Sequence, residues 1–374
     1  MQEDFEDYYL RRVSEIQEEK LDKEIAIIKP SDWSEISTEV YTQDPWRISN
    51  LLPEGGLVIL SSVSGEKKTW VALEMARAIV SGTPFAHSQD FKTEGCNVLY
   101  IDAENSKSEF QRRGKQLAIP NSGPFKFYVH QDDDINLNTE DKMKWLTATI
   151  EYYQAKVVFI DTFRAVTGGL SDDKSVEVRE FFNRFKALKD KGVCIVLLDH
   201  FRKPNNLDGK VPKKEHLIGS QDKTASSEVL LMLRSESGTE KIEVFQRKNR
   251  LGKEIKPFEI TMSDTFDDKG VITTTLKYSG ELDDETTKKE DAKSVIQDLL
   301  TVSPKTTKEL ISVMQKEVGS RNVRQALVEL EESKTIESRR KGREKEYFMP
   351  FVDYSKTPNG VTQEEIWEAL NQSQ

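Results

Sequence analysis

Between residues 55 and 280, short continuous apolar runs alternate with segments in which apolar residues recur at helical spacing. The apolar runs predict buried strands, namely GLVIL (56–60), NVLYIDAE (97–104), FKFYVH (125–130), VVFIDT (157–162) and CIVLLDH (194–200). Helices are predicted between them, over 69–80, around 109–112, over 139–153 and over 176–189. Continuous apolar strands separated by helices indicate a parallel sheet that is covered on both faces.

The pattern changes after residue 226. The runs SEVLLMLR (227–234) and KIEVFQRK (241–248) flank the turn SESGT and predict an antiparallel pair, which makes the sheet mixed. The polar segment ELDDETTKKE (281–290) predicts a linker. Beyond it, three short helices are predicted over 290–301, 306–317 and 320–333, followed by two strands around Gly342. Three helices and a β-wing are the pattern of a winged helix-turn-helix domain, here over 291–350.

Both ends of the chain are polar. Residues 1–40 form a charged extension, in which Tyr9, Val13 and Ile16 predict an amphipathic helix outside the main core. A partly disordered arm is the alternative. Residues 351–374 form a tail with one short amphipathic helix near 363–370. The first residues, MQEDFEDYYLRR, lack the basic start and apolar core of a secretory signal.

Composition narrows the class of function. The net charge is −10, from 55 Lys and Arg against 65 Asp and Glu. This argues against a static DNA-coating protein and leaves DNA contact through local basic loops open. No apolar run approaches the roughly 20 residues of a membrane span, so no membrane partner is expected. Cys96 and Cys194 lie inside apolar runs, which predicts core residues in a reducing cytosol and a cytoplasmic protein.

A candidate phosphate-binding loop follows the first strand. Such a loop needs inward backbone N–H groups, a lysine for the β- and γ-phosphates and a hydroxyl for Mg²⁺, usually as GxxxxGK followed by Ser or Thr. In SVSGEKKT (62–69), Lys68 and Thr69 are in register, but Ser62 and Lys67 replace the two glycines. A solvated turn is the alternative reading, yet the strand before the loop and the helix after it favour phosphate binding. The residues predicted to bind the nucleotide are Ser64, Gly65, Glu66, Lys67, Lys68, Thr69 and Trp70.

Lys67 is the departure with a physical consequence. A side chain at that position can block the close approach of the backbone to phosphate, although the lysine could instead add positive charge. We therefore expect weakened affinity or turnover.

Three other strand ends carry polar residues. Asp161 is predicted to hold Mg²⁺ beside Thr69, with helix capping as the alternative. Glu104 is predicted to orient and deprotonate the attacking water; Asp102 competes for this role but lies farther from the carboxyl end of its strand. His200 could sense the γ-phosphate or simply cap its strand.

The order of these elements resembles the RecA superfamily, and within it the plasmid RepA-type and DnaB-type replicative helicases and their phage relatives. The resemblance covers about residues 45–260 and rests on WRISNLLPEGGLVIL, KTWVALEMARAIVSG, VLYIDAENS, VVFIDTFRAVTGG, LLDHFRK and IGSQDKTASSEVLLML. It implies an α/β fold over 41–280, with a RecA-like mixed, mostly parallel sheet and helices on both faces. It also implies that Glu104 is the catalytic glutamate and His200 the sensor.

The resemblance further extends to Lys248-Asn249-Arg250, which matches a KxR motif of the family. It implies that Arg250 is an arginine finger acting on the nucleotide of a neighbouring subunit, with Lys248 beside it. Self-association into a ring or filament follows, with a hexamer as the expected form.

Two loops are implied to bind single-stranded DNA. One covers about 164–174, with paired glycines. The other covers 202–220 and can neutralise phosphates with its basic residues. These are Arg202, Lys203, Lys210, Lys213 and Lys214. A solvated surface loop is the alternative.

The predicted winged helix carries its own basic residues. Arg321 and Arg324 lie at the exposed start of the candidate recognition helix, whereas Val323, Leu327 and Leu330 face the core. The wing adds cations suited to phosphate contact. These are Arg339, Arg340, Lys341, Arg343 and Lys345. Protein docking remains the alternative, because Glu329, Glu331 and Glu332 make the same helix acidic.

Together these patterns predict an ATP-driven, oligomeric DNA-processing motor, a replicative-type DNA helicase of a plasmid, phage or mobile element. It would hydrolyse ATP with Mg²⁺ at subunit interfaces and bind single-stranded DNA, with duplex DNA as a second candidate partner. A nucleotide-switched DNA-binding regulator with weak or no unwinding activity is the main alternative. A scaffold with a dead nucleotide site is a further one.

Overall fold

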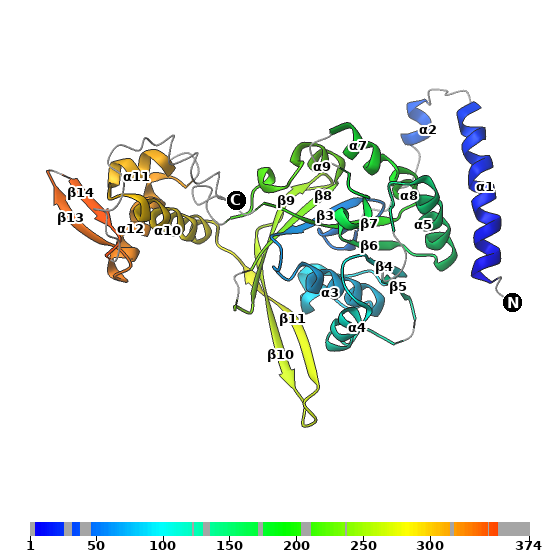
Figure 1. Ribbon diagram of the computed structural model, residues 1–374, viewed down its shortest axis with the longest axis horizontal. Coiled ribbons are helices and arrows are strands. Elements are labelled where there is room, and N and C mark those ends of the chain that lie inside the picture. The colour runs from blue at the N-terminus through cyan, green and yellow to red at the C-terminus, as the bar shows by residue number, and fades with distance from the viewer. Residues whose placement is uncertain are drawn as a thin grey trace. The chain divides into compact units, whose positions relative to one another are not determined.

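The computed structural model describes residues 4–25, 32–37, 46–121, 123–129, 135–170, 175–202, 211–235, 238–314, 318–342 and 344–350 (Figure 1). The chain divides into two compact units. One comprises Met1–Lys203 and Pro212–Glu281, and the other Pro204–Val211 and Leu282–Gln374. No helix in the described ranges is long and apolar enough to cross a membrane.

The larger unit is built on a sheet that has nine strands within the described residues, in the order β11-β10-β9-β8-β3-β7-β6-β4-β5. Its parallel strands are β3 (Leu57–Ser62), β4 (Val98–Asp102), β5 (Phe125–Val129), β6 (Val157–Asp161), β7 (Cys194–His200) and β8 (Val229–Arg234). The strands β9 (Lys241–Asn249), β10 (Phe258–Phe266) and β11 (Ile272–Glu281) continue it in antiparallel pairing. A small hairpin of β1 (Trp46–Ile48) and β2 (Leu52–Pro53) precedes the sheet.

Helices cover both faces of this sheet (Figure 1). The helices α3 (Lys68–Ser81) and α4 (Lys107–Gln116) lie on one face. The other face carries α5 (Glu140–Tyr153), the one-turn α6 (Phe163–Val166), α7 (Ser175–Asn183), α8 (Lys186–Asp190) and α9 (Ser220–Ser226). The connecting helices switch from one face of the sheet to the other because the chain first runs outward from β3 to β5. It then returns through β6 and β7 to β8, and right-handed crossovers in opposite directions place their helices on opposite faces. The predicted α/β class, a RecA-like mixed and mostly parallel sheet between helices, is confirmed.

The sheet register brings the polar strand ends to one edge. Asp102 of β4 pairs with Asp161 of β6, and Ser62 of β3 pairs with His200 of β7. All of β3 is buried, which explains its unbroken apolar run before Ser61 and Ser62. Ligands of parallel α/β sheets bind at the carboxyl ends of the strands, so this edge is where a site is expected.

Near the N-terminus, α1 (Phe5–Ile25) packs on α5. The ring of Phe5 lies 5.1 Å from that of Tyr152, and Arg12 Nε donates to Glu151 Oε2 at 2.6 Å. The short helix α2 (Trp33–Ser37) follows. The charged extension thus contains a helix that is held by aromatic contacts and an ion pair.

The smaller unit contains α10 (Asp284–Val302), β12 (Lys305–Thr306), α11 (Thr307–Met314), α12 (Ser320–Glu332), β13 (Glu337–Lys341) and β14 (Glu344–Phe348). Its described strands form one sheet in the order β12-β14-β13, and buried apolar residues such as Ile296, Leu310 and Leu327 form a core. The winged helix-turn-helix assignment stays a prediction. The tail helix predicted near 363–370 lies outside the described residues.

The segment 281–290 was predicted to be a linker, but α10 begins at Asp284. Its first residues favour a helix start, since Asp284 and Glu285 place negative charge in the first turn, where it suits the helix dipole. Polarity alone therefore did not mark a linker here.

Candidate nucleotide site

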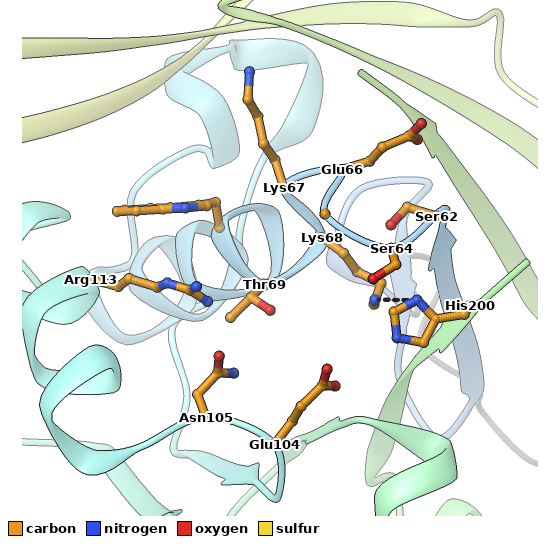
Figure 2. Close-up of a pocket in the computed structure, with 12 residues that line it drawn as sticks. Ser62, Ser64, Glu66, Lys67, Lys68, Thr69, Glu104, Asn105, Arg113 and His200 are labelled. Atoms are coloured by element: carbon orange, nitrogen blue, oxygen red, sulfur yellow. Dashed lines mark hydrogen bonds between the residues drawn. The ribbon is translucent and has the colours of Figure 1, made fainter. Parts of the chain in front are cut away.

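The loop between β3 and α3 borders a cavity of about 210 Å³ (Figure 2). The predicted nucleotide-binding residues line it, together with Glu104 and His200. The cavity also includes residues that the sequence analysis did not single out as ligands, namely Ser62, Asn105 and Arg113. The loop, two strand ends and α4 therefore meet at one place on the sheet edge.

Lys68 is the buried cation of the cavity, at 6% exposure. Its Nζ lies 3.4 Å from His200 Nδ1 (Figure 2). Burial lowers the pKa of Lys68, while Asp161 and Glu104 partly oppose the shift. Burial and the charge of Lys68 also lower the pKa of His200, which favours its neutral form. A buried ammonium group beside a neutral imidazole suits an anionic ligand, which would compensate the charge.

Asp161 and Thr69 form the candidate metal site. Thr69 Oγ1 donates to Asp161 Oδ2 at 2.7 Å, and the Tyr100 hydroxyl donates to the same oxygen at 3.2 Å. A hydroxyl and a carboxylate next to a phosphate loop are the hard oxygen ligands that Mg²⁺ prefers. These residues therefore fit the cation.

The pKa of Asp161 leads to a testable pH dependence. Burial, and next the charge of Asp102, raise this pKa from 3.8 to about 7. A carboxyl group with a raised folded-state pKa contributes stability below its unfolded-state pKa, and loses that contribution as the pH rises through the folded value. As the pH rises from 3.8 to about 7, we expect the unfolding free energy of the metal-free protein to fall by roughly 1 kcal/mol per pH unit. Asp161→Asn should flatten the slope in urea unfolding, and parallel slopes would contradict the assignment.

Glu104 and Asp102 have different surroundings. Asp102 is fully buried and its Oδ1 accepts from the backbone N–H groups of Glu104 and Asn105, at 3.1 and 2.8 Å. The Asn105 side chain donates to Asp102 Oδ2 at 3.0 Å. Glu104 lines the cavity, and Figure 2 shows it on the side opposite the loop. The geometry therefore favours Glu104 for contact with substrate and makes Asp102 a support of its turn.

Arg113 is a cation of the cavity that the sequence analysis missed. Its Nε donates to Glu109 Oε1 at 2.9 Å, and its guanidinium carbon lies 5.6 Å from the centre of the Trp70 ring. Glu109, one turn earlier in α4, therefore orients the Arg113 side chain. The signal in the sequence was the four-residue spacing in a helix that directly follows Glu104.

Lys67 adopts a left-handed conformation, with φ of 57°, which is the region that a glycine occupies without strain. Its Nζ donates to the carbonyl oxygen of Thr239 in the turn between β8 and β9. Figure 2 shows its side chain extending away from the cluster of Lys68, Thr69 and His200. The lysine therefore does not fill the space beside those residues. Its predicted effect on turnover stays a prediction.

The strain at Lys67 predicts an order of stability. Lys67→Gly loses the bond to Thr239 but relieves a left-handed cost of roughly 1–2 kcal/mol, so its unfolding free energy should stay near wild type. Lys67→Ala loses the bond and keeps the strain, so it should be less stable than Lys67→Gly by about 1 kcal/mol. Urea denaturation measures both. An alanine variant as stable as the glycine variant would refute the strain.

Arg250 lies at the other end of the strands from the cavity, beside the amino end of β3. Its backbone N–H donates to the carbonyl oxygen of Glu228 at 2.9 Å, and the Glu228 carboxylate accepts from Leu57 N at 2.6 Å. Leu57 begins β3 and Ser62 ends it, so about 17 Å of strand separates Arg250 from the loop. The Arg250 side chain is 55% exposed and donates to the carbonyl oxygen of Ala225 at 2.8 Å. The structure therefore does not bring Arg250 to its own chain's cavity.

Lys248 contacts the end of α9. It donates to the carbonyl oxygens of Thr224, Ala225 and Ser227. Burial, and next the charge of Arg250, lower the pKa of Lys248 to about 8. Like Arg250, it does not line the cavity.

The basic residues predicted to bind DNA lie in both units. Lys214 is exposed and pairs with Glu254 at 3.6 Å, Lys213 is half-buried, and Arg202 is exposed. Lys203, Lys210 and Arg343 lie outside the described residues, as do 171–174 of the first loop.

In the smaller unit, Arg321 and Arg324 are exposed on α12, while Val323, Leu327 and Leu330 are buried as predicted. Arg340 is also exposed.

Several wing cations are bound to carboxylates. Arg339 Nε and Lys341 Nζ both donate to Glu346, at 2.8 and 2.6 Å, and Lys345 pairs with Glu331 at 3.0 Å. The pairing follows from strand register, because Arg339 lies opposite Glu346. The positive charge available to a phosphate is thus smaller than the count of basic residues implied.

The comparison with known families agrees with this geometry. Residues 24–206 match the family model of an AAA domain. The match includes Lys68, Glu104, Asp161 and His200, and it supports an ATPase domain of the P-loop class over these residues, which implies nucleotide binding. The AAA match ends before Arg250 and before α10. No curated protein matches the chain.

Proposed function

We propose that this protein is an ATP-driven, oligomeric DNA-processing motor, a replicative-type DNA helicase of a plasmid, phage or mobile element. The observation that carries the proposal is that the candidate ATPase residues lie at opposite ends of the strands of one sheet. Lys68, Thr69, Glu104 and His200 line the cavity at the carboxyl edge, whereas Arg250 is exposed at the amino edge. An arginine placed there can act on a nucleotide only if that nucleotide belongs to another copy of the chain.

The residues at the carboxyl edge divide the chemistry of hydrolysis. Lys68 neutralises the β- and γ-phosphates, and Thr69 with Asp161 holds Mg²⁺, which would neutralise charge as it develops on the phosphates. Glu104 orients the attacking water and accepts its proton. His200, whose Nδ1 lies 3.4 Å from Lys68 Nζ, donates a hydrogen bond to the terminal phosphate in this proposal.

Arg250 completes the site from the neighbouring subunit by stabilising charge in the transition state. Its exposure leaves the guanidinium accessible to a second copy. This division makes hydrolysis depend on assembly, as in a ring or filament.

DNA would be bound by local positive charge on an otherwise acidic chain. In the described residues, Arg202 and Lys214 of the larger unit and Arg321, Arg324 and Arg340 of the smaller unit are exposed. The paired wing cations favour a modest contribution from the wing.

The deciding experiment is the ATPase rate with and without single-stranded DNA, together with strand displacement. We expect DNA to stimulate hydrolysis and ATP to drive displacement, with Glu104→Gln as the inactive control. Duplex binding that depends on nucleotide, without unwinding or stimulation, would favour the regulator instead. Equal ATP affinities of wild type and Lys68→Ala would favour the scaffold.

A further inference from the structure

The short helix α9 lies between the nucleotide cavity and the residues at the far edge of the sheet. Lys223, in the middle of α9, is 1% exposed. Its Nζ donates to Asp199 Oδ2 at 2.8 Å and lies 4.2 Å from the centre of the Phe163 ring. Phe163 begins α6, two residues after Asp161. A buried ion pair and a cation–π contact thus join α9 to the ends of β6 and β7.

On the side of the nucleotide, Asp199 connects Lys223 to His200. Its Oδ1 accepts from the His200 backbone N–H at 2.8 Å, while Oδ2 accepts from Lys223. His200 Nδ1 in turn lies 3.4 Å from Lys68 Nζ. Because one planar carboxylate bonds both groups, a shift of the His200 backbone that keeps its bond to Asp199 moves the carboxylate and with it the partner of Lys223.

At the other end of α9, its last turn accepts hydrogen bonds from Lys248 of β9 and from Arg250, which follows β9. Ala225 accepts from Arg250 Nη2 at 2.8 Å and from Lys248 Nζ at 3.3 Å, and Ser227 accepts from Lys248 at 2.5 Å. Carbonyl groups at a helix C-terminus carry partial negative charge, which suits these cations. A displacement of α9 would therefore change the support of the Arg250 side chain, whose backbone N–H is bonded separately to Glu228.

We propose that Lys223 is a positioning residue that couples the state of His200 beside the nucleotide to the placement of Arg250 for the next subunit. The inference rests on the proposed action of Arg250 on a neighbour. Its warrant is an unbroken series of contacts from Lys68 through His200, Asp199 and Lys223 to the end of α9. Each subunit thereby makes its arginine available according to its own nucleotide.

The test uses mixed assemblies of two variants. The acceptor carries Arg250→Ala, so its intact cavity depends on a neighbour. The donor keeps Arg250 and carries either Glu104→Gln, which binds ATP without hydrolysing it, or Lys68→Ala, which leaves its cavity empty. Mixed assemblies are isolated through a tag on the donor, and ATP hydrolysis is measured. We expect the loaded donor to restore hydrolysis about 5–150-fold better than the empty donor, the usual range of coupling between sites.

The same two donors are then made with Asp199→Asn and Lys223→Met together. Replacing both partners avoids leaving a buried charge unpaired, so the donor should remain folded. The loaded and empty donors should now restore hydrolysis equally. The matched control is Lys144→Met in α5, because Lys144 is also buried, at 8% exposure, and lies 3.4 Å from Glu140. In control donors the difference between loaded and empty should persist.

The outcomes separate this inference from the proposed function. If neither donor restores hydrolysis, Arg250 does not act on a neighbour, and both proposals are wrong. If loaded and empty donors with the native pair are equally effective, trans action stands and the coupling is refuted. A difference that survives loss of the Asp199–Lys223 pair would likewise overturn the role of Lys223.

Discussion

Replacing Arg250 with alanine should lower the ATPase rate of the protein by about 10³–10⁵-fold while ATP binding is retained, as its proposed action on a neighbouring nucleotide implies. The reason is geometric. Arg250 is bonded near the amino end of β3, whereas Lys68 follows its carboxyl end, so Arg250 could act only on the nucleotide of another copy of the chain. Steady-state hydrolysis and binding of a fluorescent ATP analogue measure the two effects separately.

The control for Arg250 is Arg184→Ala, which removes an exposed arginine that follows α7 and does not line the cavity. Its rate should match wild type. The wild-type rate per subunit should also rise with protein concentration, because dilution would separate Arg250 from the neighbouring site on which it is proposed to act. A rate that is independent of concentration, with an active Arg250→Ala variant, would show that hydrolysis is completed within one chain.

Glu104→Gln should lower the rate by about 10²–10⁴-fold, the usual contribution of a general base. ATP affinity should be retained, since Lys68, Thr69 and Asp161 are untouched and glutamine keeps the size of the side chain. A single-turnover assay with bound ATP isolates the chemical step from binding.

Asp102→Asn separates the two carboxylates that compete for this role. Asparagine keeps the Oδ1 that accepts from the turn, but it places an amide N–H₂ where Asp102 Oδ2 accepts from the Asn105 side chain, so stability should fall by about 1–3 kcal/mol. Its effect on the chemical step should be smaller than that of Glu104→Gln. An Asp102→Asn protein that is fully folded and as inactive as Glu104→Gln would move the catalytic role to Asp102.

Substitutions at Lys67 test how the candidate phosphate loop keeps its backbone shape without its usual glycines. A lysine with φ of 57° shows that the loop has kept a conformation suited to glycine. The side chain contacts Thr239 outside the cavity, and this contact offsets part of the conformational cost. The loop therefore differs from the usual pattern more in sequence than in backbone shape.

The sequence by itself determined the fold class and the set of strand-end residues. Parallel strands have their carboxyl ends on the same side of the sheet. The strands that end in Asp161 and His200, and the loop with Lys68 and Thr69 that follows β3, therefore come together there. Local pattern is sufficient for this result, since it depends only on strand direction and order.

Tertiary structure decided the contacts between segments that are distant in the chain. It placed Arg113 in the cavity, paired Lys223 with Asp199, turned Lys67 toward Thr239 and bound Arg339 and Lys341 to Glu346. It also put Arg250 at the edge away from its own cavity. Sequence spacing states which side chains are charged, but their partners depend on register and helix packing across the fold. Those partners determine which cations remain available for a ligand.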